Sequence, residues 1–429
     1  MCSRLFSLLF ALCIAASSFG FDLDGPPVNY EKAATDNVIT QLEKRLQAGE
    51  TKLQYDKKFG YLRDLLKELC VPESSQVLVF SKTSLQRHKI APDRPRSIYF
   101  NDRVYVGHCR NGDVLEISAA DPNLGTVFYT LDQRKPDKPR ITRQADACLI
   151  CHASSSNQGI PGHVVRSVYT DTDGQPLLGM GTHRTDQTSP FRQRWGGWYV
   201  SGTSGRQVHM GNLILRDRQD ESDIDLKAGT NVTDLNKYFD PADFLTPHSD
   251  IVALMVMEHQ SQMHNLFARA ALQMRVALWQ EEDINKALGR PASYRSETTA
   301  RRIQSAADSI LRYMLFCEET ALIDPVAGTS SFAKEFPSTG PRDRTGRSLR
   351  DLDLQSRLFK YPCSYLIYSP EFDKLPAEVR DRVLQRLHEV LWEKDNSADF
   401  AHLSSADRKA IREILSATKP NLPGSWREK

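Results

Sequence analysis

Two cysteines and a histidine form the part of the chain where residue types and spacing most clearly indicate chemistry. Residues 148–152 read Cys-Leu-Ile-Cys-His. Residues three apart lie on one face of a helical turn, so the two thiols point the same way, with the histidine next to them. Such a group can attach covalently to a porphyrin and bind its iron, form a disulfide, or join two further ligands around zinc.

The spacing favours covalent haem over both alternatives. Composition alone yields this pattern with a chance of roughly 0.4 % in a chain of this length. A zinc site needs two further ligands at short spacing, and only the loose pair His259 and His264 offers them. In an exported protein, a disulfide between Cys148 and Cys151 stays open as an alternative. We expect Cys148 and Cys151 to carry one haem c and His152 to be an axial ligand of its iron.

At these residues the chain resembles the c-type cytochromes. The resemblance implies thioether bonds from Cys148 and Cys151 and an axial bond from His152. It covers five residues strongly, and residues 402–415 resemble the closing helix of cytochrome c domains more weakly. The chain departs from small all-helical cytochromes, because strand patterns follow the motif. It is also similar to a group of large secreted bacterial proteins, without established activity, that carry one C-x-x-C-H with RWGGWYV and EHQ segments.

The N-terminal residues predict export. Arg4 precedes an apolar run over residues 5–16, which has the length of a signal-peptide core and is too short to span a bilayer. Residues 1–20 are therefore predicted to be a signal peptide, and the protein to be periplasmic or otherwise exported, without a stable membrane span. The 56 Lys+Arg and 54 Asp+Glu residues nearly balance. This balance gives no reason to expect a nucleic-acid partner, and the redox partner is not predicted.

Hydrophobic periodicity predicts an α+β fold. Short β-branched and aromatic runs between residues 76 and 131 predict strands, and a hairpin follows at 163–184. From 251 to 288 the pattern is that of one long helix. The strand-rich N-terminal half thus carries the motif, and the C-terminal half is helical. We divide the chain into a signal peptide (1–20), an N-terminal α+β region (21–140), a haem-attachment and β region (141–249) and a helical region (250–429).

Shorter sequence patterns predict the remaining helices and one long loop. The other predicted helices are 30–48, 58–69, 296–318, 351–359, 376–393 and 404–416. Residues 325–350 are rich in Gly, Pro, Ser and Thr and predict a loop. Outside the motif, the cysteines that follow the signal peptide are Cys70, Cys109, Cys317 and Cys363, and the sequence does not give their pairing.

The sixth iron ligand is predicted less directly. Polar residues from Glu258 to Asn265 interrupt the apolar pattern of the long helix. Buried polar groups need partners, so these residues border the haem, form a buried polar network or simply make up a solvated face. We take His259 as the first choice for the sixth ligand and Met210 as the second. Cations that could pair with haem propionates are Arg143, Arg166, Arg184, Arg192 and Arg194.

The predicted function follows from the haem. Haem moves one electron, so an electron-transfer cytochrome is the first expectation. A haem-dependent peroxidase or oxygenase is the alternative, because a simple carrier does not need a chain of 429 residues. A secreted non-haem protein with a Cys148–Cys151 disulfide is the further alternative.

Overall fold

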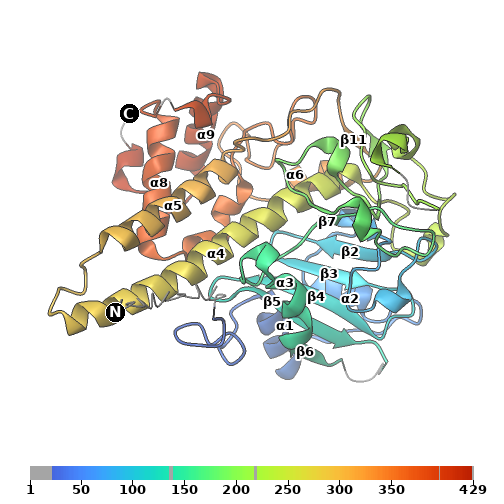
Figure 1. The fold of residues 1–429 in the computed structure, drawn as a ribbon, viewed down its shortest axis with the longest axis horizontal. Helices are drawn as coiled ribbons and strands as arrows, with labels where there is room; N and C mark the ends of the chain where they lie inside the picture. The colour runs from blue at the N-terminus through green and yellow to red at the C-terminus, as the bar shows by residue number, and fades with distance from the viewer. Residues whose placement is uncertain (1–21, 135–138, 217–219, 396, 428–429) are drawn as a thin grey trace, which may run out of the picture.

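The structure is a computed structural model that describes residues 22–134, 139–216, 220–395 and 397–427. The predicted signal peptide, residues 1–20, lies outside the described residues. Within them the chain is α+β, and this prediction is confirmed. Strands dominate the N-terminal half, and helices dominate the C-terminal half around one long helix (Figure 1).

One antiparallel sheet organises the N-terminal half. In the described residues seven strands pair in the order β6-β5-β4-β3-β2-β1-β9. They are β1 (Val77–Val79), β2 (Arg96–Phe100), β3 (Val104–His108), β4 (Val114–Asp121), β5 (Gly125–Asp132), β6 (Ile141–Gln144) and β9 (Trp198–Tyr199). Two further pairs are β7 (Arg166–Ser167) with β8 (His183–Arg184), and β10 (Gly202–Thr203) with β11 (Ala327–Gly328). The first of these pairs is the hairpin predicted at 163–184.

The two faces of the sheet have different neighbours, because successive side chains of a strand point to opposite faces. Ile117 of β4 packs in a core with Leu42 of α1 (Val38–Gln47) and Leu65 of α2 (Leu62–Glu68). Ser118 and its partner Phe128 in β5 point to the opposite face. That second face lies toward the candidate site and the long helix.

The long helix α4 (Ile251–Ala287) confirms the helix predicted at 251–288. Asp250 caps its start by accepting from the backbone N–H groups of Val252 and Ala253. The helix approaches the sheet closely at Gly125, where an added Cβ would lie 2.7 Å from Cβ of Ala268. None of the described helices is both long enough and apolar enough to cross a bilayer.

The other helices of the C-terminal half pack around α4 and on one another. Figure 1 shows α4 running diagonally between the sheet and the C-terminal helices. These helices are α5 (Glu297–Met314), α6 (Phe332–Ser338), α7 (Pro370–Asp373), α8 (Ala377–Leu391) and α9 (Ser405–Thr418). The helices predicted at 296–318, 376–393 and 404–416 correspond to α5, α8 and α9.

Two local predictions in this half were wrong. The predicted loop 325–350 contains β11 and α6. The helix predicted at 351–359 is absent from these described residues. Asp353 instead accepts the N–H groups of Gln355 and Ser356, and Leu354 adopts a φ of +59°. A side chain that binds the backbone two and three residues ahead stabilises a turn in place of a helix.

Candidate functional site

The C-x-x-C-H motif forms the short helix α3 (Asp146–His152), which directly follows strand β6. Leu149 packs against the core, whereas the Ile150 side chain is 76 % exposed. Cys151 is exposed, Cys148 is partly buried, and both are free thiols. Burial raises the pKa of the Cys148 thiol to about 11, so it is protonated at neutral pH.

His152 is fixed by a reciprocal pair of hydrogen bonds with Gly162. The Gly162 N–H donates to the His152 carbonyl (3.1 Å), and the His152 ring nitrogen Nδ1 lies 2.8 Å from the Gly162 carbonyl oxygen. A carbonyl can only accept, so Nδ1 carries the proton and Nε2 carries the lone pair. Nε2 makes no hydrogen bond to any described residue. The imidazole is therefore oriented as a ligand through Nε2.

The surroundings keep this imidazole neutral. The ring of Phe128 packs on that of His152 with a centroid separation of 4.6 Å. Burial lowers the pKa of His152, and the hydrogen bond to Gly162 opposes this effect without cancelling it. A neutral imidazole is the form that binds a metal.

Gly162 is required by the close approach of two amide side chains. An added Cβ would lie 2.3 Å from Nδ2 of Asn157 and 2.3 Å from Oδ1 of Asn265. Asn265 also binds the backbone of the next residue, accepting from the His163 N–H and donating to its carbonyl, both at 2.8 Å. The loop that orients His152 is thus attached to α4, which lies more than 100 positions later in the chain.

Other polar residues of α4 form a buried network, which is one of the three predicted possibilities. The Nε2 group of Gln260 donates to the Tyr105 hydroxyl (2.8 Å), and its Oε1 accepts from the Tyr365 hydroxyl (2.7 Å). Nδ1 of His264 lies 3.4 Å from the same Tyr105 hydroxyl. This network connects the sheet, α4 and the C-terminal region through the core.

The structure does not place His259 in contact with His152. The His259 ring is fully buried, with Nδ1 at 2.5 Å from Gln187 and Nε2 at 2.8 Å from Ser364. It stacks on Phe316 with a centroid separation of 4.6 Å, and burial lowers its pKa to about 3. Both ring nitrogens already have partners, so this arrangement gives no support to His259 as the sixth ligand.

Met210 also lies apart from the motif. Its sulfur accepts a hydrogen bond from the Ser167 hydroxyl at 3.5 Å, and it packs with Tyr169 and Leu213 in a small cluster. Neither choice for a sixth ligand contacts His152 in the described structure. The identity of that ligand stays a prediction.

The RWGGWYV and EHQ segments meet in a buried ion pair. Nη1 of Arg194 lies 3.2 Å from Oε2 of Glu258, and both side chains are almost fully buried. Burial raises the pKa of Glu258 to about 7, and Arg194 opposes the rise. Arg194 is thus engaged with Glu258 and does not serve as the expected propionate partner.

The other candidate cations occupy different places. Arg143 donates to the carbonyls of Tyr30 and Ala33, and Nε of Arg166 donates to the Thr182 hydroxyl. Nη2 of Arg184 lies 3.5 Å from Oδ1 of Asn157, in the loop that orients His152. Arg184 is therefore a predicted cation that the fold brings to the motif.

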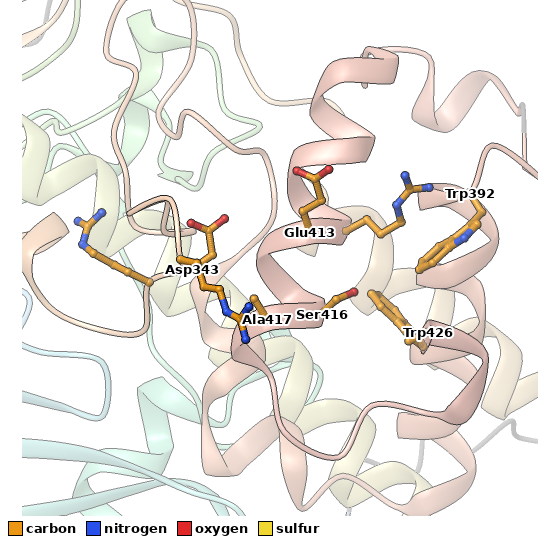
Figure 2. Close-up of a pocket in the computed structure, with 9 residues that line it drawn as sticks. Asp343, Trp392, Glu413, Ser416, Ala417 and Trp426 are labelled. Atoms are coloured by element: carbon orange, nitrogen blue, oxygen red, sulfur yellow. The ribbon is translucent and has the colours of Figure 1, made fainter. Parts of the chain in front are cut away.

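A larger hollow lies elsewhere, between α9 and the C-terminal residues. It has a volume of about 590 Å³. Figure 2 shows Trp392 and Trp426 on one side of it and Asp343 on the other. Arg347 pairs with Asp343 (2.7 Å) and with Glu413 (2.9 Å), so these acidic groups are already neutralised. None of the predicted site residues lines this hollow.

Neither a metal cluster nor a known relative adds to this description. In the described ranges, no group of three or more His, Cys, Asp and Glu side chains converges as a metal site, so the zinc alternative gains no support. Comparisons with protein-family models, curated proteins and solved structures find no match to the chain. The function is therefore inferred from the geometry around His152.

Proposed function

We propose that the chain is an exported mono-haem c-type cytochrome. Cys148 and Cys151 would hold the porphyrin through thioether bonds, and Nε2 of His152 would bind the iron. When bound, the haem would supply one-electron transfer. The observation that carries the proposal is the hydrogen bond from His152 Nδ1 to the Gly162 carbonyl, which leaves Nε2 with its lone pair and without a partner.

The residues of α3 fit this group. Both thiols lie on one short helix, three residues apart, with His152 directly after the second. The neighbouring His152 is neutral. A histidine oriented through a carbonyl has no evident role beside a disulfide bridge, which favours the haem over that alternative.

Residues around the motif have distinct roles in this proposal. The Gly162 carbonyl fixes the His152 tautomer and increases the basicity of Nε2. Phe128 limits rotation of the imidazole by packing on its ring. Leu149 anchors the helix in the core, and the Cys151 thiol is exposed beside the partly buried Cys148 thiol.

The proposal is tested by the visible spectrum of protein exported from a host with cytochrome c maturation machinery. A sharp absorption band of the reduced protein that survives denaturation is expected in the wild type. It should be lost in Cys148→Ala/Cys151→Ala. Cys70→Ala, which removes an exposed thiol outside the motif, should retain it. A folded, colourless wild type would overturn the proposal.

The spin state of the oxidised protein then separates two kinds of haem protein. Low-spin iron with two axial ligands supports the electron carrier proposed here. High-spin iron with an open position and reactivity toward peroxide would instead favour the haem-dependent peroxidase or oxygenase.

A further inference from the structure

A smaller cavity lies beside the loop that orients His152. It has a volume of about 180 Å³, and its lining includes His163, Arg184, Gln262, Asn265 and Arg269. His163 directly follows Gly162, and Asn265 holds the backbone of His163. The cavity is smaller than the usual pockets for drug-sized ligands, so it can hold only a ligand of a few atoms.

Two guanidinium groups border this cavity without a carboxylate partner. Among the described residues no ion pair joins Arg184 or Arg269 to a carboxylate, although the charge of Asp186, which also lines the cavity, opposes the lowering of the Arg184 pKa by burial. Nε of Arg269 is buried and has no hydrogen-bond partner. Burial lowers the pKa of Arg269, and the positive charge of Arg184 lowers it further. An anion placed between the two groups would offset the desolvation of Arg269 and the repulsion between the two positive charges.

Neutral groups of the lining favour the same kind of ligand. Oε1 of Gln262 accepts from Nδ2 of Asn265 at 3.3 Å, and the Nε2 group of Gln262 donates to no described residue. Asp186 is the one carboxylate in the lining, and its Oδ1 accepts from the backbone and hydroxyl of Thr188 at 2.8 and 2.7 Å. The free donors of the cavity therefore come from Gln262 and the two arginines.

We propose that this cavity binds a small oxyanion, a carboxylate or a phosphate, between the guanidinium groups of Arg184 and Arg269. The planar guanidinium offers two parallel N–H donors that match two oxygens of such an anion. The Nε2 group of Gln262 supplies a neutral donor. The anion is either free in solution or a carboxylate of a haem at the neighbouring motif. Anion binding can be measured in a chain that carries no haem, so its test does not rest on the proposed function.

The test uses inorganic phosphate and the full chain carrying Cys148→Ala/Cys151→Ala, which cannot attach haem. Phosphate should raise the Tm saturably, and acetate serves as a second probe. Arg269→Gln should weaken the apparent Kd by at least about tenfold. Arg275→Gln is the matched control, since Arg275 lies on the same helix, is partly buried and does not line the cavity.

The haem-loaded wild type then identifies the source of the anion. Phosphate binding that persists indicates a free anion, and binding that disappears indicates that a haem carboxylate fills the cavity. Both results support the oxyanion site. Arg184→Gln provides a second variant if Arg269→Gln does not fold, as judged by circular dichroism. Absence of a saturable response to phosphate and acetate in the haem-free chain, or an equal loss in Arg275→Gln, would overturn the proposal.

Discussion

Replacing Gly162 by alanine tests the packing that orients His152. Gly162 does not adopt a left-handed backbone conformation, so alanine introduces no dihedral strain, and the effect is one of space. The added methyl group would lie 2.3 Å from a nitrogen of Asn157 and 2.3 Å from an oxygen of Asn265. At these distances at least one amide must move.

The expected loss of stability follows from the hydrogen bonds that the displaced amide side chains make. Asn265 makes two hydrogen bonds of 2.8 Å with the backbone of His163, and neutral hydrogen bonds contribute about 0.5–1.5 kcal/mol each. Overpacking by one methyl group typically costs about 1–3 kcal/mol. We expect Gly162→Ala to lower the free energy of unfolding by about 2–3 kcal/mol, within the range these two effects define.

Urea unfolding followed by circular dichroism measures this change. The midpoint should fall while the slope with denaturant stays constant. Gly424→Ala is the control, because an added Cβ there meets no atom within 4 Å. Its effect should stay within about 0.5 kcal/mol of zero.

A double-mutant cycle makes the reasoning refutable. Asn265→Ala removes one of the two atoms that the new methyl group would meet. Gly162→Ala should therefore cost less in the Asn265→Ala background than in the wild type. If Gly162→Ala is as mild as Gly424→Ala, or if its cost is unchanged in that background, the loop is not held as described.

Three further predictions concern stability. Glu258→Ala leaves Arg194 buried without a counter-charge and should cost about 3–5 kcal/mol of unfolding free energy in urea. The double variant Arg194→Met/Glu258→Leu should cost less than the summed costs of Arg194→Met and Glu258→Leu measured singly, and additive costs would contradict the ion pair. Burial lowers the pKa of His108 from 6.5 to about 4. The unfolded chain then binds a proton that the folded chain excludes, so stability is lost as pH falls from 6.5 toward 4. In that pH window, the slope of unfolding free energy against pH should be smaller in His108→Gln than in the wild type by about 1.4 kcal/mol per pH unit. Equal slopes in the two proteins would contradict this assignment to His108. Ser404→Ala removes the capping box of α9 and should cost about 1 kcal/mol in thermal or urea unfolding, while Ser405→Ala should cost less.

Periodicity predicted the strand-rich N-terminal half and the helical C-terminal half, because it reports burial within one element. The apolar pattern over 251–288 gave α4 almost to the residue. It failed at 351–359, where the carboxylate of Asp353 binds backbone N–H groups and stabilises a turn. Apolar spacing does not reveal such competition between a side chain and the helical backbone.

The candidate site was predictable only where it is local in sequence. Five consecutive residues identify the motif, but the partner of His152 is the Gly162 carbonyl, and Asn265 on a distant helix holds the loop. The polar residues of α4 correctly indicated buried partners without identifying them. His259 bonds to Gln187 and Ser364, which no sequence spacing connects.

Peptide mass mapping of the exported, matured protein tests the central claim most directly. The peptide that contains residues 148–152 should carry the mass of one haem on Cys148 and Cys151. The peptides that contain Cys70 and Cys109 should carry none. Unmodified thiols at 148 and 151 after maturation in a competent host, or a disulfide that joins them, would contradict the account.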